Sequence, residues 1–246
     1  MTYDEENVRS IEVGYKGMHF DNTLQLNLSF YNYDYDGYQD RLNVLDPVRG
    51  TQVDIVQNAN KAINNGFEVE SLWLPTDALT LGGNYSYTEA YYDEDYWVVI
   101  TDDPAVPPEL FGDALNAPEL FAVNAKGSQL KRIPVHKATA WGTYEMNTSI
   151  GSFSLRGTWS YTGEYYSAGV ERSLDEVPAR DRIDVSVTWR DLASNWDVRL
   201  FVDNVTDEHN LRDISSGGSA NNWRMTGSIL APRYWGVDVK YNFGAY

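Results

Sequence analysis

Residues 183–202 read IDVSVTWRDLASNWDVRLFV, and the two alternating runs in this stretch decide the fold class. The first run, Ile183 to Trp189, has an apolar residue at every second position. The second, Trp196 to Val202, does the same with the single exception of Phe201. Because successive side chains of a β-strand point to opposite faces, each run predicts a strand with one apolar and one polar face. The polar stretch Arg190–Asn195 predicts the turn that joins them into a hairpin.

The same period of two recurs along the whole chain, and helical periodicity is nearly absent. The predicted strands are 9–18, 23–35, 62–74, 79–92, 136–146, 152–166, 179–190, 196–206 and 232–243. Their connections alternate between short turns and long loops, the long ones lying near 36–61, 93–135, 167–178 and 207–231. This order is typical of an antiparallel up-and-down β-barrel whose two rims differ, as in outer-membrane barrels.

Composition excludes several classes of protein. The 246 residues include 19 Lys and Arg against 36 Asp and Glu, a net charge of −17, which disfavours binding to nucleic acid. The absence of Cys excludes disulfides, thiolate metal sites and Cys nucleophiles. The chain contains no run of about 18 apolar residues, so the sequence predicts no transmembrane helix. The 18 Tyr, 8 Trp and 8 Phe residues predict an ordered chain, since disordered acidic chains are poor in aromatic residues.

The aromatic residues gather at the two ends of the predicted strands. Three tryptophans flank the short turns, and a second group lies toward the long loops: Trp73, Trp189 and Trp196, then Tyr85, Tyr87, Trp159 and Tyr161. Such bands suit the two interfaces of a membrane, whereas a soluble sandwich would carry its largest rings in mid-strand. The pattern therefore favours a transmembrane barrel, with a soluble all-β fold as the alternative.

Six segments carry recurring motifs that together identify a resemblance. They read SIEVGYK at 10–16, FYNYDYD at 30–36, NGFEVE at 65–70, IPVH at 133–136, VDNVTD at 202–207 and PRYWGVDVKYNF at 232–243. In this order they resemble the C-terminal barrel region of TonB-dependent outer-membrane receptors. The family fold is a plugged barrel of about 22 strands. The resemblance implies that residues 1–246 supply about nine C-terminal strands, with no counterpart here of the plug domain or the N-terminal strands.

The resemblance also implies a function. It predicts a receptor in the outer membrane of a Gram-negative bacterium, not an enzyme and without a cofactor, that imports a ferric siderophore or another scarce ligand. Expected partners are outer-membrane lipid, the ligand, TonB acting through the missing plug, and the outer-membrane assembly machinery. The alternatives are a soluble all-β carbohydrate-binding or structural protein, and a different outer-membrane barrel such as a porin or a barrel lipase.

Two groups of aromatic residues are candidate functional residues. The first could form a vestibule for the ligand or belong equally to the outer aromatic girdle: Tyr91, Tyr92, Tyr96, Trp97, Tyr165 and Tyr166. The second resembles the closing signal that the assembly machinery reads: Trp235, Val237, Val239, Tyr241 and Phe243.

The polar residues predict no catalytic or metal site. Glu68 and Glu70 share one face of a strand, and a polar lumen wall explains them better than a catalytic carboxylate pair. The acidic run Asp93–Asp95 lacks the ligand spacing of a calcium loop, so we expect a solvated loop. The three histidines lie too far apart along the proposed topology to hold one metal ion.

Overall fold

The computed structural model describes residues 3–46, 51–99, 122–216 and 224–243. Nine strands form one antiparallel sheet in which each strand pairs with the next one along the list. They are β1 (Asn7–His19), β2 (Leu24–Asp36), β5 (Lys61–Thr76), β6 (Leu79–Tyr92), β9 (His136–Thr148), β10 (Gly151–Thr162), β13 (Arg180–Arg190), β14 (Trp196–Asp203) and β17 (Tyr234–Tyr241). All nine predicted strands are confirmed, and the order is the up-and-down meander that the alternating connections indicate.

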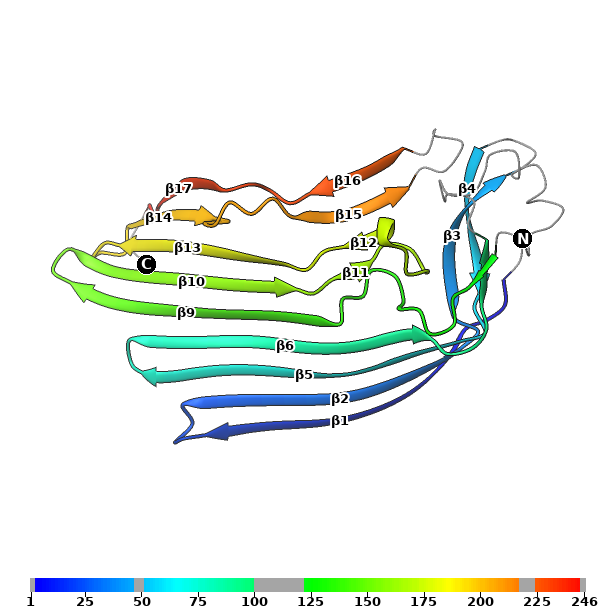
Figure 1. Cartoon of the computed structure of the whole chain (residues 1–246). Helices are drawn as coiled ribbons and strands as arrows, with labels where there is room; N and C mark the ends of the chain where they lie inside the picture. The colour runs from blue at the N-terminus through cyan, green and yellow to red at the C-terminus, as the bar shows by residue number, and fades with distance from the viewer. Residues whose placement is uncertain (1–2, 47–50, 100–121, 217–223, 244–246) are drawn as a thin grey trace.

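The two rims of the sheet differ as expected. Figure 1 shows the strands side by side from β1 at the bottom to β17 at the top, with the short turns on the left and the long connections on the right. The first short turn places Phe20, Asp21 and Asn22 at positive φ, and the hydroxyl of Thr23 closes it with a 2.8 Å bond to the Phe20 carbonyl. Asp and Asn tolerate this left-handed conformation better than most residues, which fits them to the turn.

The long connections contain secondary structure that the sequence did not reveal. Their described residues form four small two-stranded sheets and one 3₁₀ turn, η3 (Ser173–Asp175). Their strands are β3 (Gln39–Asp46) with β4 (Thr51–Asn58), β7 (Trp97–Val99) with β8 (Ala122–Asn124), β11 (Tyr165–Tyr166) with β12 (Glu176–Val177), and β15 (Leu211–Ser216) with β16 (Met225–Ile229). The strand predicted at 152–166 therefore ends earlier, at Thr162, and residues 165–166 belong to a separate small sheet.

The apolar side chains of the large sheet share one exposed face. Val187 lies directly across from Leu155 on one side and from Leu200 on the other, so the three side chains point the same way. Leu200 is 53% exposed and Val239 is 60% exposed. A continuous apolar face of this size is a surface for lipid or another apolar partner and is unusual for a soluble monomer.

The buried core lies at the rim, in the long connections and the strand ends beside them, and not along the middle of the sheet. Ten buried residues form this cluster, which we call the loop core: Leu42, Ala59, Ala62, Ala90, Tyr92, Tyr96, Val98, Ala125, Leu130 and Val170. They come from the ends of β5 and β6 and from three different long connections. The end of the molecule that carries the irregular backbone is thus the end with a conventional hydrophobic core.

The sheet has two edges, β1 and β17, which do not pair with each other among the described residues. In hydrocarbon each unpaired backbone group costs several kcal/mol, so lipid tolerates only closed sheets. We therefore expect both edges to be paired when the wall is assembled in a membrane. Among the described residues, no helix is long and apolar enough to cross a membrane.

A pair of arginine substitutions tests the assignment of the two faces. Val185 is on the apolar face near mid-strand, and Thr158 lies on the opposite face across from Asp184. We expect Val185→Arg to reduce the free energy of folding into bilayers by about 2–4 kcal/mol. Thr158→Arg should cost much less, because the new guanidinium can meet the Asp184 carboxylate. Equal losses of folding free energy in the two full-length variants, measured by equilibrium refolding into bilayers, would contradict the assignment.

Candidate functional site

The polar face of the sheet is a ladder of paired charges. Arg199 lies across from Asp238 at 3.2 Å, and Arg190 lies across from Asp197 at 2.7 Å. Arg182 contacts both Asp184, at 2.7 Å on its own strand, and Asp203, at 3.4 Å on the next. The contacts between neighbouring strands match the pairing expected of a barrel lumen, and together with the Arg182–Asp184 pair they leave this part of the wall nearly neutral.

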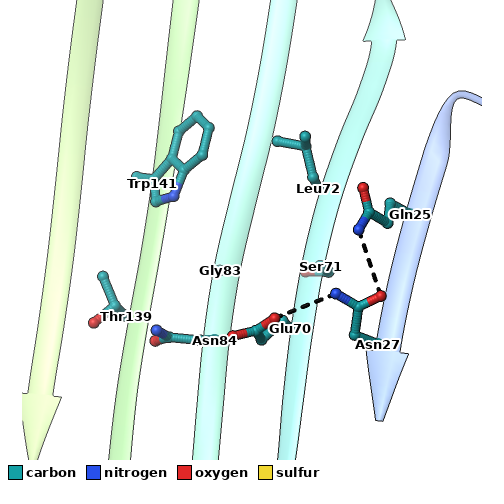
Figure 2. A pocket seen from close by; sticks show the side chains of 9 residues that line it. All are labelled: Gln25, Asn27, Glu70, Ser71, Leu72, Gly83, Asn84, Thr139 and Trp141. Atoms are coloured by element: carbon teal, nitrogen blue, oxygen red, sulfur yellow. Dashed lines mark hydrogen bonds between the residues drawn. The ribbon is translucent and has the colours of Figure 1, made fainter. Parts of the chain in front are cut away.

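The wall formed by β2, β5, β6 and β9 holds a shallow open hollow of about 270 Å³. Amide and carboxylate groups line it together with two apolar side chains, as Figure 2 shows: Gln25, Asn27, Glu70, Ser71, Leu72, Gly83, Asn84, Thr139 and Trp141. Asn27 donates to Glu70 at 3.2 Å and accepts from Gln25 at 3.5 Å. The hollow therefore offers hydrogen-bonding groups that are partly satisfied by one another.

Trp141 is the largest side chain of this hollow, and both a glycine and a cation fix its ring. The guanidinium of Arg156 lies over the ring, 4.2 Å from its centroid. The ring leans toward Gly82 on the neighbouring strand, where any Cβ atom would overlap it. The Arg156 guanidinium also donates to the Thr143 hydroxyl at 3.3 Å. The Trp141 ring is thus a fixed part of the wall, and its face toward Arg156 is covered.

A row of tyrosines leads from this wall to the loop core. Every second residue of the FYNYDYD motif is a tyrosine on the polar face, and ring centroids follow at 5.3 Å from Tyr31 to Tyr33 and 6.5 Å from Tyr33 to Tyr35. Tyr38 continues the row at 5.7 Å and lies 6.2 Å from Tyr92 of the loop core. The motif identified the family resemblance, but its alternation alone did not reveal that the rings form one continuous row.

The structure separates the six candidate vestibule residues. Tyr92 is fully buried, and Tyr96 lies against it with ring centroids 5.1 Å apart inside the loop core. Tyr165 is buried as well and donates to the carbonyl of Arg212. Trp97, by contrast, is 56% exposed. The buried rings pack the connections together and offer no open surface in this conformation.

Tyr91 and Tyr166 are half-buried and retain partly open surface. Whether any of the six residues contacts a ligand stays a prediction.

The outer girdle predicted from sequence consists of rings in contact on the apolar face. Phe67 lies 5.7 Å from both Tyr85 and Tyr87, and His136 accepts or donates a 2.8 Å bond with the Tyr85 hydroxyl. His136 therefore contacts the girdle through its hydrogen bond with Tyr85. Among the described residues no group of three or more His, Asp or Glu side chains could hold a metal ion.

The closing strand presents its alternating apolar residues on the same outer face. Trp235, Val237, Val239 and Tyr241 lie opposite apolar residues of β14. Tyr241 lies 4.6 Å from both Trp196 and Phe243, measured between ring centroids. Their recognition by the assembly machinery stays a prediction.

Hydrogen bonds join the segments that carry the VDNVTD and PRYWGVDVKYNF motifs. Asn204 is buried, and its side-chain amide donates to the carbonyls of Glu208, at 2.9 Å, and Ala231, at 3.3 Å. Asp207 accepts from the backbone N–H of Arg233 at 3.0 Å. Because Asn204 also adopts positive φ, β14 ends at Asp203 and not at 206 as predicted. These contacts join the end of β14 to the segment just before β17.

Burial and the charge of Asp40 raise the pKa of two tyrosines: Tyr96 in the loop core, and Tyr38, which packs against it. Burial, followed by the charge of Asp40, raises the pKa of Tyr38 to about 12. The same two causes raise the pKa of Tyr96. Both effects disfavour the phenolate, so the folded loop core holds these hydroxyls protonated through the physiological range.

This shift predicts a pH dependence of the loop core. The raised pKa means that the stabilising contribution of neutral Tyr38 is complete below its ordinary pKa of 10 and is lost as pH rises to about 12. We expect the difference in phenolate absorbance between the wild type and Tyr38→Phe to have its midpoint near pH 12. A midpoint near pH 10 would show that Tyr38 is solvated in the assembled protein.

Solved structures of outer-membrane receptors share this fold. The ferric yersiniabactin uptake receptor FyuA of Yersinia pestis matches with a TM-score of 0.71 and 15% identity, over 97% of this chain and 30% of that one. The siderophore receptor PiuA of Acinetobacter baumannii matches with a TM-score of 0.68 and 16% identity, over 95% and 28%. The copper transporter OprC matches with a TM-score of 0.66 and 14% identity, over 98% and 32%. The chain thus spans about a third of the length of these proteins.

The family is established by sequence. Residues 2–205 match the family described as TonB dependent receptor-like, beta-barrel. No curated protein sequence matches the chain. The family consists of outer-membrane transport receptors of Gram-negative bacteria and not of enzymes, so the soluble alternative is rejected. The nine-stranded sheet, its polar wall and its apolar outer face therefore belong to the β-barrel of a TonB-dependent receptor.

Proposed function

We propose that this chain forms barrel wall and extracellular loops of a receptor that imports a scarce ligand across the outer membrane, driven by TonB. The family match over residues 2–205 carries the proposal. The sheet supports it physically, because one face suits lipid and the other suits an aqueous or plugged lumen. TonB would act through a plug domain in the full-length protein, and the outer-membrane assembly machinery would insert the barrel.

A ferric siderophore is the proposed ligand. Two of the similar structures are receptors for ferric yersiniabactin and for a siderophore, which supports this class. The long-connection rim supports it as well, because it combines an exposed Trp97 with the tyrosine row that begins below it. Aromatic side chains with polar edges commonly line small-molecule sites. The similarity to a copper transporter makes a copper ion the second candidate.

The geometry suggests different roles in transport for the loops and for the barrel wall. The loops would capture the ligand at the rim, and the wall below would offer it polar side chains whose charges are already paired. A wall of paired charges holds a passing ligand weakly, which favours release over retention. The open hollow beside Trp141 would add hydrogen-bonding groups low on the wall.

Uptake by cells that express the full-length protein tests the proposal. We expect accumulation of radioactive iron supplied as ferric siderophores, with loss of accumulation in a strain that lacks TonB. TonB-dependent accumulation of radioactive copper would instead identify copper, the second candidate, as the ligand. Accumulation that is equal with and without TonB would contradict the proposal and would indicate passive diffusion through the barrel.

A matched pair of tryptophan substitutions tests whether the long-connection rim binds the ligand. Trp97 is exposed at the long-connection rim, while Trp159 lies on the outer face and stacks on Tyr161 with ring centroids 6.2 Å apart. If Trp97 is an aromatic anchor, Trp97→Ala should weaken ligand binding to the full-length protein at least about tenfold. Trp159→Ala should leave affinity unchanged. Equal affinities for the two variants, measured by ligand titration, would remove Trp97 from the site.

A further inference from the structure

We infer that one buried carboxylate, that of Asp40, fastens the described parts of the long connections together so that these parts move as a single body. We call the group formed by Asp40, Tyr92 and Lys131 the loop latch. The inference concerns the mechanics of the rim and does not depend on which ligand is bound.

Asp40 makes the first contact of the loop latch. It lies on β3, in the connection between β2 and β5, and is 1% exposed. The hydroxyl of Tyr92 donates to its Oδ2 at 2.8 Å. Tyr92 is the last residue of β6 and is fully buried. The bond therefore joins the first connection to the end of β6, which lies two strands beyond β2 in the sheet.

Lys131 supplies the opposite charge from the second long connection. Its Nζ forms an ion pair with Asp40 Oδ1 and also donates to the carbonyl of Arg41. The backbone around Lys131 is itself fixed, since Leu130 N–H donates to the Ala90 carbonyl at 2.8 Å. Lys131 therefore brings a positioned charge to a carboxylate that lies 91 residues earlier in the sequence.

The third connection closes over this pair. Gly169, between β10 and β13, lies so close that an added Cβ atom would be 2.8 Å from the Tyr92 hydroxyl oxygen and 3.4 Å from Asp40 Oδ2. Its neighbour Val170 is buried in the loop core. Glu171 accepts from the backbone N–H of Gln129 at 2.8 Å, which is a second link to the connection that carries Lys131.

The fourth connection joins through the second and third. Arg132, next to Lys131, forms an ion pair with Asp213 on β15 at 2.9 Å. The hydroxyl of Tyr165 on β11 donates to the carbonyl of Arg212. A continuous set of contacts thus runs through the described parts of all four long connections, and Asp40 and Tyr92 of the loop latch are its most buried residues.

The physics of a buried charge makes the loop latch cooperative. An ionised carboxylate in a dry interior is stable only while its counter-charge and hydrogen-bond donors stay in place. Moving the first or the second connection away would leave Asp40 or Lys131 uncompensated, and moving the third would uncover the pair on the side of Gly169. Partial opening is therefore penalised, and the connections should open together or remain closed.

Hydrogen exchange measured by mass spectrometry on the full-length protein in lipid nanodiscs tests the inference. In Asp40→Asn we expect exchange at least about tenfold faster in segment 125–131, where Gly127 and Leu130 N–H groups are bonded, and in segment 167–175. The matched control is Asp54→Asn, which removes the same charge from the same hairpin where Asp54 pairs with Arg41 at 2.6 Å in an exposed position. The control should leave both segments unchanged.

A local role would give a different result. If exchange rises only within residues 39–58, or nowhere, while the barrel retains its heat-dependent gel mobility, the inference is wrong. Should Asp40→Asn fail to assemble, Tyr92→Phe and Lys131→Met apply the same test. Tyr92→Phe keeps the ring and removes only the hydroxyl donor. Faster exchange in both distant segments would support the inference, and unchanged exchange in both variants would overturn it.

Discussion

Every backbone polar group of a membrane-spanning strand must find its partner inside the sheet, because hydrocarbon offers none. This requirement explains why the nine strands pair without interruption and why almost all irregular backbone lies at the rims. Within the described part of the chain, the large sheet has a single register shift, between Trp73 and Thr76, beside a short turn. Within that constraint the side chains are free to differ by face, and the two faces of one strand meet opposite environments.

The same constraint moves the hydrophobic core out of the sheet. The apolar face of the strands packs against no other layer of the described chain, whereas the loop core brings together residues from three connections. Buried charge appears in the same place, with Asp40 and Asp175 both nearly inaccessible. Stability of the wall thus depends on hydrogen-bonded strands and lipid, while order of the rim depends on packing and buried polar contacts. The two parts can therefore respond separately to a substitution.

The long alternating strands could be predicted from sequence because eight or more residues of alternation leave little ambiguity. The short strands β7 and β11, of three and two residues, could not, since so few residues carry no period. The candidate vestibule shows a second limit. Tyr92 and Trp97 look alike in sequence, each an aromatic residue near a strand end, yet one is buried and one exposed. Tyr92 packs in the loop core and donates to Asp40, 52 residues away, and no local pattern reports those contacts.

Spin-label accessibility along β13 tests most directly whether the sheet is a wall between lipid and lumen. The chain has no Cys, so single cysteines at positions 183–188 would label this segment without competing sites in it. In the full-length protein in bilayers, collisions with oxygen, which concentrates in lipid, should peak at Ile183, Val185 and Val187 and fall at the positions between them. Collisions without a period of two, or maxima at Asp184, Ser186 and Thr188, would contradict the account.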